Sequence, residues 1–250
     1  MKKSKLRIDK LLVQKGLCET REKAQALILA GKVSIKAPSG ELKKVSKPGT
    51  QVEESVEIHI EEDIPYVSRG GLKLEGALKV FEIDPKGKIC LDIGASTGGF
   101  THCLLLHGAK KVYALDVGKG QLHYKLRNDP RVVVMEKINA RYLTSEMFEE
   151  QFDLITIDVS FISLTKILPP LKPLLKDEGF ILALIKPQFE LTPKEVKKGI
   201  VKSSFLHKKA VDKVWDFSLE QEYKPLGVAE SPILGAKGNK EFFILLSTKK

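Results

Sequence analysis

The sequence predicts an α/β fold with a doubly wound, Rossmann-like parallel sheet, preceded by a small α+β domain. From residue 88 onward, short apolar runs alternate with helical segments, as expected for parallel strands that are buried on both faces. The first run, 89–93, leads into a glycine-rich turn over 94–99, and the second, 111–115, leads into Asp116. This order of strand, turn, helix, strand and acid typically binds a nucleoside cofactor. Because the spacing Gly-x-x-x-Gly-Gly departs from Gly-x-Gly-x-x-Gly, NAD is disfavoured.

The first sixty residues predict a compact module of two helices and a small sheet. Apolar residues at helical spacing predict a helix over 6–15. Thr20 is the expected N-cap of a second helix, which ends at Gly31. The other expected elements are strands at 32–36 and 56–60 and turns at 38–40 and 47–50.

This N-terminal module also carries most of the excess positive charge. The chain has 42 Lys and Arg against 32 Asp and Glu, and residues 1–60 hold 13 basic and 7 acidic groups. Such an imbalance favours a polyanion partner, but a basic surface that only aids solubility has the same composition. The segments 7–12, 20–24, 31–33 and 47–49 are similar to the S4-like RNA-binding domain. The alternative interpretation of this module is a helical cap that packs on the second domain. The residues expected to contact RNA phosphates are Lys5, Arg7, Lys10, Arg21, Lys23, Lys32 and Lys36.

An acidic run at 61–63, followed by Pro65, marks the expected boundary between two domains. We expect domains over 1–63 and 69–250, joined by a linker over 64–68. Apolar residues at helical spacing after Lys73 place that lysine in the first turn of a helix. The strands expected in the second domain are 89–93, 111–115, 132–135, 154–158, 180–185 and 241–246, the last of them antiparallel because the loop 235–239 is too short for a crossover helix.

Ligands in such a sheet gather beyond the carboxyl ends of the strands. Asp158 and Lys186 each follow an apolar run, so they would lose hydration on folding unless they are paired. Their position alone leaves open both a structural salt bridge and a functional site. The other polar residues expected at this edge are Asp92 with the glycine-rich turn, Asp116 and the segment 139–141.

Four of the chain's charged residues match a known catalytic set. Lys73, Asp158, Lys186 and Glu241 stand in the order and context of the Lys-Asp-Lys-Glu tetrad of the FtsJ-like RNA ribose 2′-O-methyltransferases. More closely, the chain resembles the TlyA-type rRNA methyltransferases, historically labelled haemolysin A, which join an S4-like domain to an FtsJ-like one. The resemblance implies a class I methyltransferase sheet, S-adenosyl-L-methionine as cofactor, and a cytidine ribose of ribosomal RNA as substrate. The matching segments are 68–74, 92–100, 116–118, 158–164, 186–190 and 238–241.

The resemblance also implies a role for each site residue. Lys186 would be the general base, which requires a neutral amine, and the other three members of the tetrad would complete the catalytic set. Arg69 and Lys198 would add RNA contacts in the second domain, where the basic stretch 194–202 is either a loop that grips RNA or a solvated hinge. The residues expected to contact the cofactor are Asp92, Gly94, Ala95, Ser96, Thr97, Gly98, Gly99, Asp116, Val117, Asn139, Ala140 and Asp158.

The cysteines and the apolar runs limit the remaining functions. Cys18, Cys90 and Cys103 have no pairing or metal-ligand spacing, so we expect a protein of the reducing cytoplasm without a metal. The N-terminus lacks the apolar centre of a signal peptide, and the longest apolar run, 180–185, is too short to span a bilayer. We expect a monomer that acts on ribosomal RNA or ribosomal subunits and has no membrane partner. The alternatives are a non-catalytic RNA-binding or ribosome-assembly factor and, less favoured, a membrane-active haemolysin.

Overall fold

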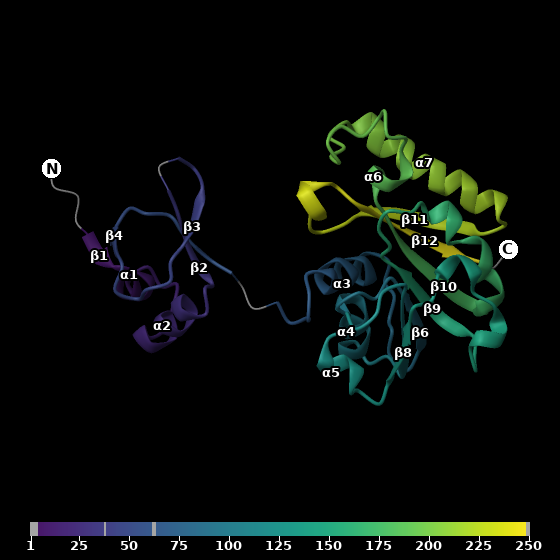
Figure 1. Ribbon diagram of the computed structural model, residues 1–250, viewed down its shortest axis with the longest axis horizontal. Coiled ribbons are helices and arrows are strands. Elements are labelled where there is room, and N and C mark those ends of the chain that lie inside the picture. Colours follow the sequence, from purple (N-terminus) through teal and green to yellow (C-terminus); the bar gives the residue numbers. More distant parts are fainter. Residues whose placement is uncertain (1–4, 38, 62–63, 249–250) are drawn as a thin grey trace. The chain divides into compact units, whose positions relative to one another are not determined.

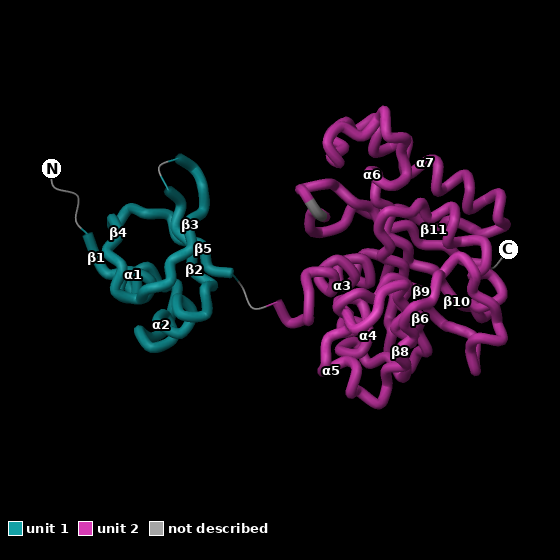
Figure 2. Tube along the Cα trace, in the orientation of Figure 1, with its two compact units in different colours: residues 1–63 teal, residues 64–250 magenta. Residues whose placement is uncertain are grey.

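The computed structural model describes residues 5–37, 39–61 and 64–248 and divides the chain into two compact units (Figures 1 and 2). Unit 1 comprises residues 1–63 and unit 2 residues 64–250. Pro38 of the expected turn at 38–40 lies outside the described residues, as do residues 62 and 63 at the expected domain boundary. Each unit has its own hydrophobic core.

Unit 1 packs two helices against two small antiparallel sheets. The helices are α1 (Ile8–Gln14) and α2 (Arg21–Leu29), and Thr20 caps α2 by accepting the backbone N–H of Lys23 at 3.2 Å. The expected helix over 6–15 is shorter than predicted, because residues 5–7 are extended and pair with a later strand. The strands are β1 (Lys5–Arg7) with β4 (Gln51–Glu53), and β3 (Leu42–Lys44), β2 (Val33–Lys36) and β5 (Ile58–Ile60) in that spatial order.

Unit 2 is built on a seven-stranded sheet in the order β11-β12-β10-β9-β6-β7-β8. The five strands from β10 to β8 are parallel, and β12 pairs antiparallel with both β10 and β11, as expected for the last strand. The sequence did not predict β11. The strands are β6 (Ile89–Ile93), β7 (Lys111–Asp116), β8 (Val132–Glu136), β9 (Phe152–Ile157), β10 (Leu175–Ile185), β11 (Lys224–Glu230) and β12 (Phe242–Ser247).

Two apolar cores cover the two faces of this sheet. One contains side chains of α3 (Gly70–Val80) and α4 (Gly99–Leu106), and the other contains side chains of α7 (Ser204–Glu220) and of a 3₁₀ segment, Pro169–Leu174. Helical segments were expected between the parallel strands, but the connections from β8 to β9 and from β9 to β10 contain only 3₁₀ turns. Three prolines at 169, 170 and 173 account for the second case, because each lacks the N–H that a longer α-helix would need. The remaining α-helices are α5 (Tyr124–Arg127) and α6 (Pro187–Glu190).

The segment 64–68, expected to be a linker, lies within unit 2. Tyr66 is buried, and its ring meets that of His102 edge to face, with the ring centroids 6.0 Å apart. The backbone N–H of Val67 donates to Nδ1 of His102 at 3.1 Å. A Cβ atom at Gly71 would fall 2.1 Å from Cγ of Tyr66, so the first turn of α3 has to be glycine for this segment to pack. The start of α3, and with it Lys73, is therefore fixed to the second unit.

Among the described residues, no helix is both long enough and apolar enough to cross a membrane.

Candidate active site

Three strands end side by side at one edge of the sheet and bring the expected catalytic residues together. Ile157 of β9 lies opposite Ile93 of β6 and opposite Ala183 of β10, and the last residue of β10 lies opposite the first residue of β12. Asp158 and Lys186 follow β9 and β10 directly, and Glu241 directly precedes the antiparallel β12. The topology therefore places all three side chains at the carboxyl edge, where the glycine-rich turn after β6 also lies.

Three residues of the glycine-rich turn have positive φ angles: Gly94, Ser96 (φ +48°) and Gly98. Gly94 has φ +84° and Gly98 has φ +98°, conformations in which a side chain would be strained. A Cβ atom at Gly94 would also fall 2.4 Å from the carbonyl oxygen of Asp158, so the turn packs directly on the backbone of that residue. After Gly98 the chain enters α4, with backbone N–H groups of its first turn facing the sheet edge.

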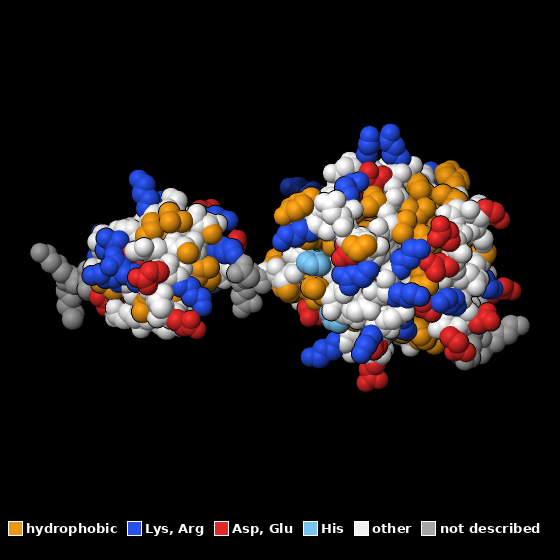
Figure 3. Space-filling model, turned by 90° about the horizontal axis from the view of Figure 1, so that it is seen from below, with side chains coloured by type: hydrophobic (Ala, Val, Ile, Leu, Met, Phe, Trp, Pro, Cys, Tyr) orange, Lys and Arg blue, Asp and Glu red, His pale blue; other side chains and the backbone are white. Residues whose placement is uncertain are grey.

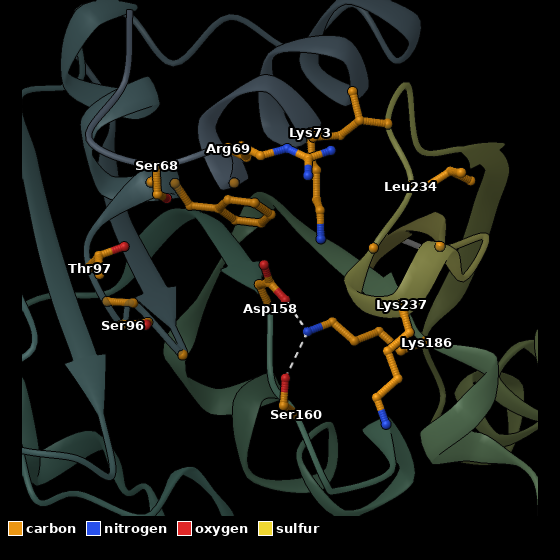
Figure 4. A pocket seen from close by; sticks show the side chains of 18 residues that line it. Ser68, Arg69, Lys73, Ser96, Thr97, Asp158, Ser160, Lys186, Leu234 and Lys237 are labelled. Carbon is orange, nitrogen blue, oxygen red and sulfur yellow. Dashed lines mark hydrogen bonds and ion pairs between the residues drawn. The ribbon is translucent and has the colours of Figure 1, made fainter. Parts of the chain in front are cut away.

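A cavity of about 660 Å³ opens between this turn and the end of β10 (Figure 4). Lys186 reaches into it with only 9% of its side chain exposed, and its Nζ lies 2.5 Å from Oδ1 of Asp158 and 3.0 Å from Oγ of Ser160. Lys73 enters from α3, and its Nζ lies 2.6 Å from Oε2 of Glu241. Two of the lysines that line the cavity, Lys73 and Lys186, are thus each held by a carboxylate.

Glu241 is the deepest member of this group. Its side chain is 2% exposed and does not line the cavity itself, but it holds Lys73, which does. A Cβ atom at Gly235 would fall 1.9 Å from Oε1 of Glu241, so the loop before β12 closes over the carboxylate. A buried carboxylate is costly without a cation, and the Lys73 ammonium at 2.6 Å supplies one.

A second hollow of about 460 Å³ adjoins the first and shares Gly94, Ser96, Asp158 and Ser160 with it. Asp116 stands at its rim, where its carboxylate accepts the backbone N–H of Ser96 at 2.8 Å and of Gly118 at 2.7 Å. These two bonds fix the carboxylate and leave it further acceptor capacity for the two hydroxyls of a ribose. The remaining wall residues are Ile93, Leu115, Val117, Gln121, Ile138, Asn139, Ala140, Arg141, Val159, Phe161, Ile162 and Ile167.

The expected cofactor residues divide into those that line the hollows and those that lie beneath them. Asp92 lines neither hollow: it is fully buried and accepts the hydroxyls of Thr101 at 2.6 Å and Thr156 at 3.1 Å. Burial raises the pKa of Asp92 to about 7, and the nearby Asp158 adds to this shift. Gly98 also lines neither hollow, since it faces the side chain of Leu126. The expected residues that do line a hollow are Gly94, Ala95, Ser96, Thr97, Gly99, Asp116, Val117, Asn139, Ala140 and Asp158.

In unit 1 the structure gathers two of the expected RNA-binding arginines around one acid. Asp9 is fully buried and accepts Nε and Nη2 of Arg7, Nε of Arg21 and Nε2 of Gln25, at 2.9–3.1 Å. The Arg7 guanidinium holds the pKa of this carboxyl well below its usual range, and Gln25 and Arg21 act in the same direction. Arg7 and Arg21 remain about two-fifths exposed, so each still presents N–H groups outward. Figure 3 shows basic side chains gathered at one end of this unit.

The other basic residues expected to contact RNA have different surroundings. Lys23 and Lys36 pair with Glu19 at 3.2 Å and Glu57 at 2.9 Å, both on the surface. In unit 2, Arg69 lines the cavity that contains Lys186, whereas Lys198 is exposed on a separate loop. The remaining members of the set are Lys5 and Lys10, which are exposed, and Lys32, which is partly buried.

Comparisons with known proteins agree with this two-unit arrangement. The FtsJ-like methyltransferase family matches residues 66–248, and the S4 domain matches residues 6–35. The chain belongs to the FtsJ-like methyltransferase family. A Bacillus subtilis relative, provisionally named rRNA methyltransferase YqxC, is 48% identical over 98% of this chain and 87% of its own.

The similarity extends to two further relatives over nearly the whole chain. The 16S/23S rRNA (cytidine-2′-O)-methyltransferase TlyA of Mycobacterium tuberculosis is 44% identical over 97% of this chain and 90% of its own. A solved structure from Streptococcus thermophilus, provisionally described as a hemolysin, is 44% identical and aligns with a TM-score of 0.76 over 99% of this chain and 90% of its own. The chain is therefore a methyltransferase-family protein of the TlyA type.

For this FtsJ-like chain the structure adds several cavity residues that the sequence did not predict, among them Ser160 and Lys237. Ser160 accepts a hydrogen bond from Lys186, and Lys237 lines the same cavity from the loop before β12. Ser160 lies two residues after Asp158 at a strand end, a position that could have been included among the polar residues of the edge. Lys237 has φ +56° in an irregular loop, so no periodic pattern could have placed it. In the described part of the chain, no three His, Cys, Asp or Glu side chains form a metal-binding group.

Proposed function

We propose that this protein transfers a methyl group to the 2′-hydroxyl of a cytidine ribose in ribosomal RNA, with S-adenosylmethionine as methyl donor. The observation that carries the proposal is the pair of Lys–carboxylate contacts in one cavity beside a glycine-rich turn. The activity for which the M. tuberculosis relative is named supports the choice of reaction and nucleoside. The S4 match in unit 1 supports an RNA substrate. We also propose that the protein acts on ribosomal subunits in the cytoplasm and that it is a monomer.

The chemistry of the second hollow fits the nucleoside part of S-adenosylmethionine. Asp116 would hold the ribose hydroxyls, and the apolar side chains of Ile138 and Ile162 would face the adenine, with Asn139 at its edge. The turn over 94–97 would contact the methionine portion, and Asp92 would support that turn from below through Thr101. When bound, the sulfonium supplies an electrophilic methyl group and departs as a neutral thioether, so the protein has mainly to align the hydroxyl and remove its proton.

We assign Lys186 the role of general base for this proton. A neutral amine has two N–H groups and one lone pair. One N–H group would donate to Ser160 at 3.0 Å, and the carboxylate of Asp158, with Oδ1 2.5 Å from Nζ, would help to orient the amine so that its lone pair faces the cavity. Lys73, held by Glu241, would orient the ribose hydroxyl as a hydrogen-bond donor. Asp158 and Glu241 thus serve as positioning residues for the two lysines.

Replacement of Lys186 tests this assignment. We expect Lys186→Ala to lower methylation of unmodified ribosomal subunits by about 10²–10⁴-fold, the usual contribution of a general base. Its affinity for S-adenosylmethionine, measured by calorimetry, should stay near that of the wild type. Lys172→Ala, which removes an exposed lysine paired with Glu222, is the matched control and should retain full activity.

The position of the label decides the reaction. With labelled cofactor and alkaline hydrolysis of the product RNA, we expect a label on a ribose that resists cleavage. A label on a base would refute ribose methylation, and near-normal turnover of Lys186→Ala would remove Lys186 as the base. Wild-type protein that fails to bind S-adenosylmethionine would favour the non-catalytic assembly factor.

A further inference from the structure

We propose that the loop 197–202 and Lys237 form a subsite for the phosphates of the RNA strand next to the target ribose, held in register with the active site by Asn239. The inference rests on the proposed function, because it names how one part of unit 2 grips the same substrate. It assigns the basic stretch after β10 to RNA binding rather than to a solvated hinge.

Asn239 joins this loop to the loop that closes over Glu241. Its side chain is 2% exposed, its Oδ1 accepts the backbone N–H of Val201, and its Nδ2 donates to the carbonyl of Gly199, both at 2.9 Å. Its own carbonyl accepts the N–H of Gly235 at 2.8 Å. A side-chain amide is suited to this task because it presents an acceptor and a donor together. Two residues further along the chain stands Glu241, so the basic loop and the Lys73–Glu241 pair share one anchor.

A second buried side chain holds the same loop from α7. Nε2 of His207 donates to the carbonyl of Val201 at 2.9 Å, and both residues are buried. Val201 therefore has its N–H bound by Asn239 and its carbonyl bound by His207. Ordering of this kind lowers the entropy that a loop loses when it binds a ligand.

The lysines of this loop are available to a ligand. In the described part of the chain, Lys197, Lys198, Lys202 and Lys237 are all exposed and have no carboxylate within ion-pair distance. The neighbouring lysines of α7 differ, since Lys208, Lys209 and Lys213 pair with Asp212, Glu195 and Glu190.

These lysines line two recesses. Lys197, Lys198 and Lys202 line a hollow of about 550 Å³, in which the acid Glu195 is already paired with Lys209 at 2.6 Å. Lys237 lines the catalytic cavity with Lys186 (Figure 4), and its Nζ lies 3.3 Å from where a Cβ atom of Gly199 would be. Gly199, which stands between Lys198 and Ile200 of the first recess, therefore lies beside Lys237 of the catalytic cavity. A row of unpaired ammonium groups leading to the catalytic cavity is complementary to a phosphate backbone that enters it.

The test compares two pairs of lysines in the full-length protein. Lys198→Ala/Lys202→Ala removes two cations of the proposed subsite, and Lys172→Ala/Lys224→Ala removes two from the opposite edge of the sheet. We expect the first double variant to raise the KM for unmodified ribosomal subunits by about tenfold. It should also lower the slope of log affinity against log salt by about 2, one for each lost phosphate contact. The control pair should match the wild type in both measurements.

Asn239→Asp tests the anchoring role without removing a cation. Aspartate has the same size, but it cannot donate to the Gly199 carbonyl. We expect a higher KM for ribosomal subunits, faster hydrogen exchange at the Val201 amide, and an unchanged affinity for S-adenosylmethionine.

The outcomes separate this inference from the proposed function. If the wild type methylates ribose but Lys198→Ala/Lys202→Ala behaves like the control pair, the subsite is refuted and the proposed function stands. If the wild type does not methylate RNA at all, the proposed function fails first. A slope and a KM that both change, with cofactor affinity intact, support the subsite.

Discussion

Asp9 in unit 1 and Asp92 in unit 2 are both fully buried, yet their surroundings favour opposite ionisation states. Asp9 accepts bonds from Arg7, Arg21 and Gln25, and its pKa is held well below the usual range. Asp92 accepts from neutral donors, among them the hydroxyls of Thr101 and Thr156, and burial raises its pKa to about 7. Loss of solvent acts on both carboxyls in the same direction, so the presence or absence of a cationic partner decides the outcome.

The difference fits the place of each acid in the molecule. Asp9 lies under two arginines that are themselves partly exposed, so its charge serves to fix cations at the surface. Asp92 lies under the glycine-rich turn, where a fixed negative charge next to Asp158 would be repelled. The ionisation state of a buried aspartate therefore has to be inferred from the groups that donate hydrogen bonds to it. Exposed fraction alone would have assigned the same state to Asp9 and Asp92.

The largest expected effect is on the pH dependence of unit 2. The folded-state pKa of Asp92, about 7, exceeds the unfolded value of about 3.9, so folding takes up a proton between these values. The free energy of unfolding should then rise as the pH falls from 7 towards 4, by up to about 4 kcal/mol relative to Asp92→Asn. The measurement is urea unfolding of both proteins at a series of pH values. If the free energy of unfolding changed with pH in the same way in the wild type and in Asp92→Asn, the raised pKa assigned to Asp92 would be refuted.

An intermediate effect is expected from Asp9→Asn in unit 1. This change leaves two arginines without their shared carboxylate, and we expect a loss of about 2 kcal/mol at pH 7, less than for a fully buried pair because both arginines are partly hydrated. Because the folded-state pKa is depressed, the contribution is present above the unfolded pKa and disappears as the pH falls through the folded value. Native-state hydrogen exchange of unit 1 amides in the full chain measures it.

A surface pair with the same charge change serves as the control for Asp9→Asn. Glu19→Gln removes the exposed Lys23–Glu19 contact and should cost no more than about 0.5 kcal/mol. Equal losses in the two variants would contradict the role assigned to Asp9.

The smallest expected effect on stability comes from removing one hydrogen bond to Asp92. Thr101→Val removes the hydroxyl that donates to Asp92 at 2.6 Å, and we expect it to cost about 1 kcal/mol at pH 8. The cost should shrink at pH 5, because a bond to an ionised carboxylate is stronger than one to a neutral carboxyl. Thr101→Ser keeps the hydroxyl and should restore most of the stability at pH 8. A cost independent of pH would indicate a packing defect instead.

The fold could be predicted largely because its strands carry continuous apolar runs. Residues 89–93 and 180–185 are short, largely apolar runs typical of buried strands, with Gly94 after the first and Pro187 soon after the second. β11 escaped prediction because Pro225 and Gly227 interrupt its pattern, as is tolerated on an edge strand with one partner. β1 has three residues, too few for any period, and exists through its pairing with β4.

The site was predictable where chemistry and topology coincide. Asp158 and Lys186 follow apolar strands, so the edge of the sheet brings them together. The hydrogen bonds of Asp9 to Arg21 and Gln25 were not predicted, because these partners lie on a different helix and only tertiary packing brings them to Asp9. Ser160 and Lys237 depend in the same way on loop conformations that leave no periodic trace in the sequence.

The contact between Gly94 and the backbone of Asp158 restricts how this enzyme family member can diverge. With 2.4 Å between a Cβ atom at 94 and the carbonyl oxygen of Asp158, any side chain at 94 would displace the loop that carries the carboxylate partner of Lys186. Under the proposed function, changes in the nucleoside pocket and changes at the proposed base Lys186 are therefore not independent at this point. By contrast, Ala95, Ser96 and Thr97 line the cavity and already carry side chains. A substitution at Gly94 would therefore alter both the glycine-rich turn and the position of Asp158.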